Sequence, residues 1–71
     1  MTQQNETLAD ALPNEMARVR TILGHYKEIG PAGAIGAMFI EQDLKNADRA
    51  VMSGDLVAMI QSLKTLRNIS E

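Results

Sequence analysis

The chain has 71 residues, no cysteine, one Tyr, one Phe and a formal net charge of −2. Without cysteine, neither a disulfide bond nor a thiolate metal site is available, and a chain this short buries only about 60% of the surface that it exposes when unfolded. Seven basic and nine acidic residues lack the basic excess typical of proteins that bind a nucleic-acid backbone.

The first twelve residues predict a flexible leader, because polar residues such as Gln3, Gln4 and Asn5 offer little apolar surface to bury. A short turn of helix capped by Thr7 is compatible with this segment. Pro13 is suited to the first position of a helix, where no N–H is needed. We therefore expect the main first helix to start at Pro13.

The first predicted helix covers residues 13–29. Its apolar residues recur in steps of four and three, which places them along one face. They are Leu12, Met16, Val19, Leu23 and Tyr26, with Ile22 and Ile29 widening the stripe. Gly30 followed by Pro31 predicts the end of the helix, because glycine adopts the left-handed conformation and proline cannot continue the helical hydrogen bonds.

The second predicted helix covers residues 31–52, and the third covers residues 56–68. The stripe of the second contains Gly33, Ala37, Ile40, Leu44, Ala47 and Val51, and that of the third contains Leu56, Met59, Ile60, Leu63 and Leu66. Gly54 is predicted to close the second helix and Asp55 to cap the third. Since short connections make consecutive helices antiparallel neighbours, we predict an all-α fold, a three-helix antiparallel bundle over residues 13–71.

The stretch from Ile29 to Ile40 contains no polar side chain. On a helical wheel, Ile35, Met38 and Phe39 point away from the stripe of the same helix, so two faces need to be covered. One face is expected to pack inside the chain and the other against a second copy, so we predict a homodimer that packs through the middle helix. The predicted interface residues are Ala32, Ile35, Gly36, Met38, Phe39 and Gln42. Enclosure by the other two helices and binding of a different protein remain the alternatives.

Small residues four apart in the same stretch, Ala32 with Gly36 and Gly33 with Ala37, indicate that a neighbouring helix approaches closely. Glycine inside a helix costs about 1 kcal/mol relative to alanine, so its use there needs a steric reason.

No catalytic, cofactor-binding or metal-binding constellation is found in the sequence. His25 is the only histidine and has no ligand four residues away on either side, and Ser53, Ser62 and Ser70 have no partners for a catalytic triad. Glu41 and Asp48 lie two helical turns apart, about 10 Å, which is too far to share a proton. We therefore predict a protein that is not an enzyme and binds no cofactor or metal.

The only basic cluster is Arg18, Arg20 and Lys27. It supports an alternative function, a small regulator that binds nucleic acid through these three side chains, although the net charge argues against nucleic acid as a partner. Neither a secretory signal nor an apolar run of about 20 residues is present, so we expect a cytoplasmic protein that is not inserted in a membrane.

Much of the chain after Leu12 resembles a group of short uncharacterised bacterial proteins of prophage-type gene neighbourhoods. The residues that carry this resemblance are Asn14-Glu15, the run from Tyr26 to Ala34, Ile40-Glu41-Gln42, Ala47-Asp48 and the segment from Ser53-Gly54-Asp55 to Met59. The resemblance implies a small accessory or regulatory protein that acts through contacts, and it implies no assigned activity and no functional residue.

Overall fold

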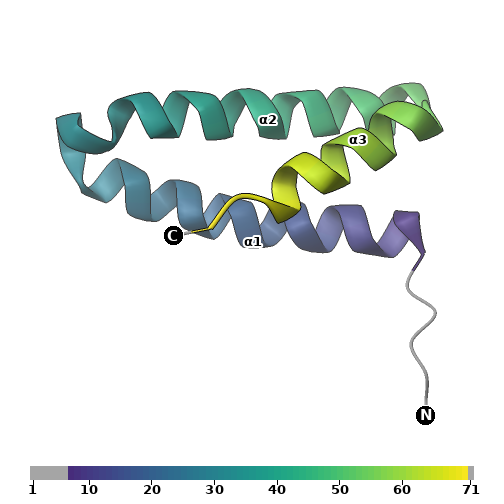
Figure 1. Cartoon of the computed structure of the whole chain (residues 1–71), viewed down its shortest axis with the longest axis horizontal. Coiled ribbons are helices and arrows are strands. Elements are labelled where there is room, and N and C mark those ends of the chain that lie inside the picture. The colour runs from purple at the N-terminus through teal and green to yellow at the C-terminus, as the bar shows by residue number, and fades with distance from the viewer. Residues whose placement is uncertain (1–6, 71) are drawn as a thin grey trace, which may run out of the picture.

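The computed structural model describes residues 7–70, and this part of the chain is all-α. It forms three α-helices, α1 (Leu8–Glu28), α2 (Ala34–Ser53) and α3 (Leu56–Arg67), with a short 3-10 helix, η1 (Gly30–Gly33), between α1 and α2; residues 7–70 contain no strand. In Figure 1, α1 and α2 lie side by side and run antiparallel, whereas α3 turns back across them at an oblique angle. The predicted all-α class with three helices is confirmed.

The predicted start of the first helix was wrong. α1 begins at Leu8, and the Thr7 hydroxyl oxygen caps it by accepting a backbone hydrogen bond of 3.2 Å from Asp10. Pro13 lies in the second turn, where its missing N–H leaves one carbonyl without its helical partner.

Residues 8–12 of the predicted leader are therefore helical, and Leu12 is fully buried in the core. The burial of Leu12 offsets the cost of the proline that follows it, since burying one large aliphatic side chain is worth about 1.5–3 kcal/mol. Residues 1–6 of the predicted leader lie outside the described residues.

The corner between α1 and α2 uses the predicted Gly30, which has a φ of 84°. Pro31 follows it within η1, so α2 starts three residues later than predicted, at Ala34. A tighter 3-10 turn is common at the start of an α-helix. Here the turn brings the backbone of Gly33 against α1.

The corner between α2 and α3 is built as predicted. Gly54 has a φ of 70° and ends α2, with its N–H directed at the carbonyls of Ala50 and Val51. The Asp55 carboxylate caps α3 by accepting a hydrogen bond of 3.1 Å from the backbone of Ala58.

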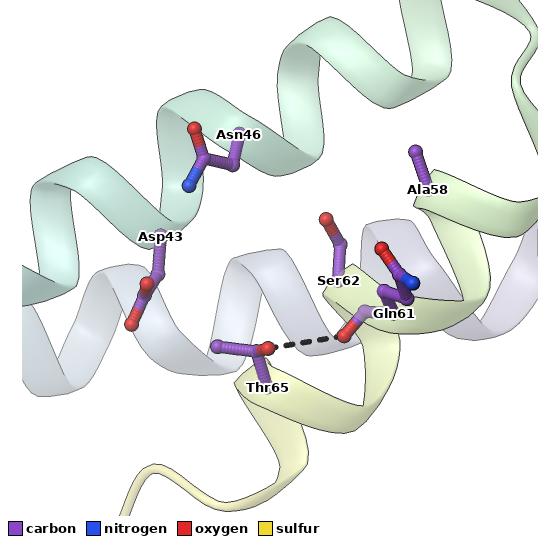
Figure 2. Close-up of a pocket in the computed structure, with 6 residues that line it drawn as sticks. All are labelled: Asp43, Asn46, Ala58, Gln61, Ser62 and Thr65. Atoms are coloured by element: carbon purple, nitrogen blue, oxygen red, sulfur yellow. Dashed lines mark hydrogen bonds between the residues drawn. The ribbon is translucent and has the colours of Figure 1, made fainter.

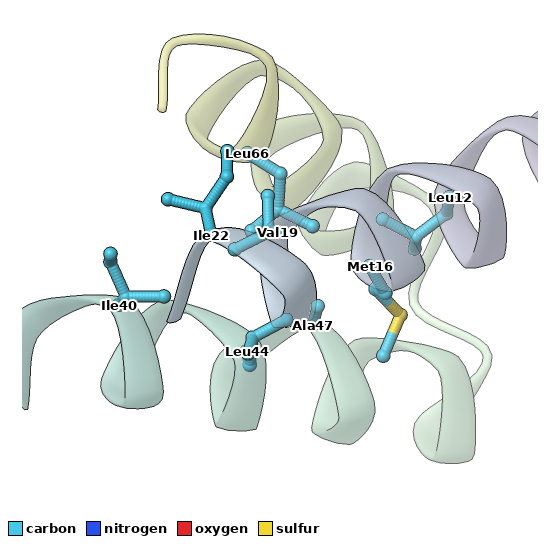
Figure 3. Packing of buried hydrophobic residues seen from close by; sticks show 8 residues of the cluster. All are labelled: Leu12, Met16, Val19, Ile22, Ile40, Leu44, Ala47 and Leu66. Atoms are coloured by element: carbon cyan, nitrogen blue, oxygen red, sulfur yellow. The ribbon is translucent and has the colours of Figure 1, made fainter. Parts of the chain in front are cut away.

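All three helices contribute to one apolar core (Figure 3). Its buried members are Leu12, Met16, Val19 and Ile22 from α1, Ile40, Leu44 and Ala47 from α2, and Leu66 from α3. The Arg18 guanidinium donates a hydrogen bond of 2.8 Å to the carbonyl of Leu66 and so fastens the end of α3 to α1.

Two of the predicted stripes contain residues that the structure leaves exposed. In α2, the predicted stripe is buried as far as Ala47, but its last member, Val51, is 45% exposed and the neighbouring Ala50 is buried instead. In α3, the predicted core residues Leu56 and Ile60 are exposed. Met59 and Leu63 of the same predicted stripe pack against the core, so the oblique crossing of α3 leaves only part of the stripe exposed, and periodicity alone does not reveal a crossing angle.

Candidate interaction surface

The predicted face of the middle helix lies on the surface of the chain. Ile35, Met38 and Phe39 are 69%, 66% and 68% exposed, and Gln42 continues the same side of α2 by one turn. We call these four residues the outer face of α2. Ala32 is also exposed, in η1 just before α2.

The outer face is exposed because α3 covers only part of α2. Towards its C-terminal end, α2 buries Leu44, Ala47 and Ala50. α3 has only 12 residues and leaves the C-terminal end of α2 obliquely towards α1 (Figure 1). The N-terminal half of α2 buries Ala37 and Ile40 and leaves its opposite side open to solvent.

Gly33 and Gly36 meet a helix closely, as predicted, but that helix is α1 of the same chain. A Cβ atom added to Gly33 would lie 2.2 Å from the carbonyl oxygen of Tyr26, and one added to Gly36 would lie 2.6 Å from the Tyr26 ring. Both distances are too short for any real contact. Gly36 therefore faces the Tyr26 ring. The close approach predicted at Gly36 is made by α1 of the same chain and not by a partner.

Two ion pairs align α1 with α2 beside this surface. The Lys27 ammonium lies 2.9 Å from the Glu41 carboxylate, and the Arg20 guanidinium lies 3.9 Å from that of Asp48. The two pairs are seven residues, or about two turns, apart on each helix, so their spacing matches the antiparallel register of α1 and α2. The hydrogen bond and positive charge of Lys27 hold the pKa of Glu41 below its ordinary value.

The three basic residues of the alternative nucleic-acid site, Arg18, Arg20 and Lys27, all form ion pairs within the chain. Arg18 pairs with Glu15 at 2.9 Å and also binds the carbonyl of Leu66. Arg20 and Lys27 pair with α2 as described above. A phosphate would have to compete with these contacts, so the arrangement does not favour nucleic-acid binding.

A second group of exposed apolar side chains, which the sequence reasoning missed, surrounds the corner between α2 and α3. It consists of Val51, Met52, Leu56, Val57 and Ile60. Met52, at 86%, is the most exposed of them. Leu56 and Val57, at the start of α3, are each 65% exposed, and helical periodicity gave no signal of this, since it placed Leu56 in the buried stripe.

A small polar groove lies between α2 and α3 (Figure 2). It is lined by Asp43, Asn46, Ala58, Gln61, Ser62 and Thr65. The Thr65 hydroxyl donates a hydrogen bond of 3.0 Å to the carbonyl of Gln61. The lining residues include one carboxylate and no histidine. These residues supply neither a nucleophile–base pair nor a metal ligand set.

His25 is exposed on α1 and is not among the residues that line this groove. Within residues 7–70, no three His, Cys, Asp or Glu side chains are gathered closely enough to hold a metal ion. No helix in the same part of the chain has both the length and the apolar character needed to cross a bilayer.

Comparisons with family models, with curated proteins and with solved structures find no match to this chain. The resemblance to prophage-type proteins therefore stays a prediction.

Proposed function

We propose that this chain is a non-enzymatic protein that acts through protein–protein contact and forms a homodimer through the outer face of α2. The observation that carries the proposal is the exposure of Ile35, Met38 and Phe39 on one side of one helix, in a stretch without charge. Large contiguous apolar patches on a protein surface mark interaction sites or cause aggregation. An accessory or regulatory role, of the kind that the prophage-type resemblance implies, fits a small protein that works by contact alone.

The energies involved predict a dimer that dissociates on dilution. Burying a whole side chain of this size is worth about 1.5–3 kcal/mol, so the exposed two-thirds of three side chains supplies roughly 3–6 kcal/mol per copy. Association costs about 4–15 kcal/mol in lost freedom of motion. The two copies together gain about 6–12 kcal/mol, so a surplus remains only where the association cost lies in the lower part of its range. At the most favourable values the surplus is about 8 kcal/mol, which corresponds to a Kd of about 1 μM, and we expect the dimer to form only at micromolar or higher concentration.

The test introduces a charge into the outer face and a matched charge elsewhere. In Phe39→Glu, the carboxylate would be buried between two copies without a partner, which is strongly unfavourable. Met52→Glu places the same charge at a more exposed apolar residue of α2, outside the outer face. Sedimentation at about 100 μM should show a dimer for wild type and Met52→Glu and a monomer for Phe39→Glu.

Circular dichroism controls for folding, because the Phe39 side chain lies outside the core and its replacement should leave the helical signal unchanged. Equal molar masses for wild type and Phe39→Glu would contradict the proposed interface. Loss of the dimer in Met52→Glu alone would move the interface to the corner between α2 and α3.

A further inference from the structure

The groove between α2 and α3 is lined by polar side chains, although facing helices in a small bundle usually pack through apolar ones. The lining consists of Asp43 and Asn46 from α2 and of Ala58, Gln61, Ser62 and Thr65 from α3 (Figure 2). Its volume is about 260 Å³. Pockets for drug-sized ligands span about 300–1,000 Å³, so this groove suits a single small chemical group.

Ser62 is 9% exposed and is the only buried polar residue in the part of the chain that the structure describes. Figure 2 shows its hydroxyl pointing from α3 towards α2, into the groove. Within residues 7–70 this hydroxyl forms no hydrogen bond, although hydroxyls inside helices often donate to the carbonyl four residues back, as that of Thr65 does. No fully enclosed side-chain N or O atom of these residues lacks a partner, so the Ser62 oxygen is reached from the groove.

Asp43 is the only charged residue of the lining. Glu41 and Asp48 of the same helix pair with α1, whereas Asp43 forms no ion pair within residues 7–70. A carboxylate without a basic neighbour repels anions and attracts cations. The lining therefore favours a positively charged group that donates hydrogen bonds to oxygen atoms.

We propose that this groove binds a guanidinium group, with the Asp43 carboxylate accepting from one edge and the Ser62 hydroxyl from another. A guanidinium is planar, carries five N–H donors and can pair with a carboxylate through two parallel hydrogen bonds. Its donors point in several directions, which suits acceptors that stand on two helices. It is also less strongly hydrated than an ammonium ion, so entering a half-enclosed groove costs it less.

The site does not depend on the proposed homodimer, because none of the lining residues belongs to the outer face of α2. A monomeric chain that binds guanidinium would contradict the homodimer alone. A dimeric chain that does not bind it would contradict the site alone.

NMR titration of the isotope-labelled chain tests the site with three probes, namely methylguanidinium, a blocked tripeptide with a central arginine, and methylammonium. Both guanidinium probes should shift the backbone signals of Asp43 and Ser62 and the side-chain amide signals of Asn46 and Gln61. Tighter binding of the peptide identifies an arginine side chain of a partner as the source of the group, and equal affinities identify a small free molecule. No shift at the groove with either guanidinium probe, or equally tight binding of methylammonium, contradicts the proposal.

Asp43→Asn removes the charge with little change of shape and should weaken methylguanidinium binding at least about tenfold, because hydrogen bonds to a charged acceptor are the stronger ones. Ser62→Ala should weaken it by about threefold, as expected for one neutral hydrogen bond. Glu28→Gln is the matched control, since it removes the same charge from an exposed residue of α1 outside the groove, and it should bind as wild type does. Equal weakening by Asp43→Asn and Glu28→Gln would reveal only a general attraction to a negatively charged chain and would refute the site.

The unliganded Ser62→Ala variant checks that the hydroxyl is not used within the fold. Removing an unpaired hydroxyl loses no hydrogen bond, and alanine has the higher helix propensity, so the Tm should be at least that of wild type. A lower Tm would mean that the hydroxyl has a partner in the chain itself, and it would overturn the assignment of Ser62 to a ligand.

Discussion

The corner between α1 and α2 is held by side chains packed on backbone, whereas the corner between α2 and α3 is held by backbone hydrogen bonds and a cap. At the first corner, Gly33 and Gly36 lie against Tyr26, and Lys27 pairs with Glu41. At the second, the Gly54 N–H and the Asp55 carboxylate satisfy the helix ends. Both corners expose apolar side chains, but only the first presents them on one straight helix face, which a second helix is able to cover.

This difference predicts that substitutions at the first corner destabilise the fold more than those at the second. Gly33→Ala should have the largest effect, because the new Cβ atom would overlap the Tyr26 carbonyl oxygen, which belongs to the backbone and cannot rotate away. We expect a loss of about 3 kcal/mol in the free energy of unfolding, measured by urea denaturation.

Gly24→Ala is the matched control, since it lies within α1 and a Cβ atom there meets nothing within 4 Å. It should stabilise the chain by up to about 1 kcal/mol through helix propensity. If Gly33→Ala unfolds at the same urea concentration as wild type, the packed description of the first corner is wrong.

Gly36→Leu and Gly54→Ala compare the two corners directly. Gly36→Leu must displace the Tyr26 ring and should cost about 2 kcal/mol, whereas Gly54→Ala places a Cβ atom in open space and costs only the strain of a left-handed backbone, about 1 kcal/mol. Thermal unfolding of the two variants should show the larger fall in Tm for Gly36→Leu. The reverse order would contradict the comparison.

The smallest effect is expected for Glu41→Gln, which removes the half-exposed ion pair with Lys27. Because Lys27 lowers the pKa of Glu41 in the folded chain, the pair stabilises the fold above the ordinary glutamate pKa of about 4.3. Its contribution is lost as the pH falls through the lower, folded pKa. Wild type should therefore be slightly more stable than Glu41→Gln at pH 7, and the two should converge in acid. A difference that grows towards low pH would contradict this role.

The sequence predicted the features that depend on local chemistry. Gly30 and Gly54 were identified as left-handed corner residues and Asp55 as a cap, because few residue types satisfy those positions. The helical wheel also placed Met38 and Phe39 away from the buried stripe, and the structure leaves both exposed and not enclosed by the other two helices. The self-association that this exposure suggests remains a prediction.

The errors concern properties set by tertiary packing. Pro13 suits a helix start by its local chemistry, but the sequence does not show that burial of Leu12 supports a helix continuing through it. The exposure of Leu56 and Ile60 depends on the oblique crossing of α3, which helical periodicity does not encode. The partner of Gly36 proved to be Tyr26 because the register of α1 on α2 brings the two together.

The molar mass of the unmodified chain over a range of concentrations tests the central claim most directly. Sedimentation equilibrium from about 1 to 200 μM should show the mass rising from 7.8 kDa towards twice that value as the outer faces pair. A mass that stays at 7.8 kDa throughout this range, with the helices intact, would contradict the claim that Ile35, Met38 and Phe39 are covered by a second copy.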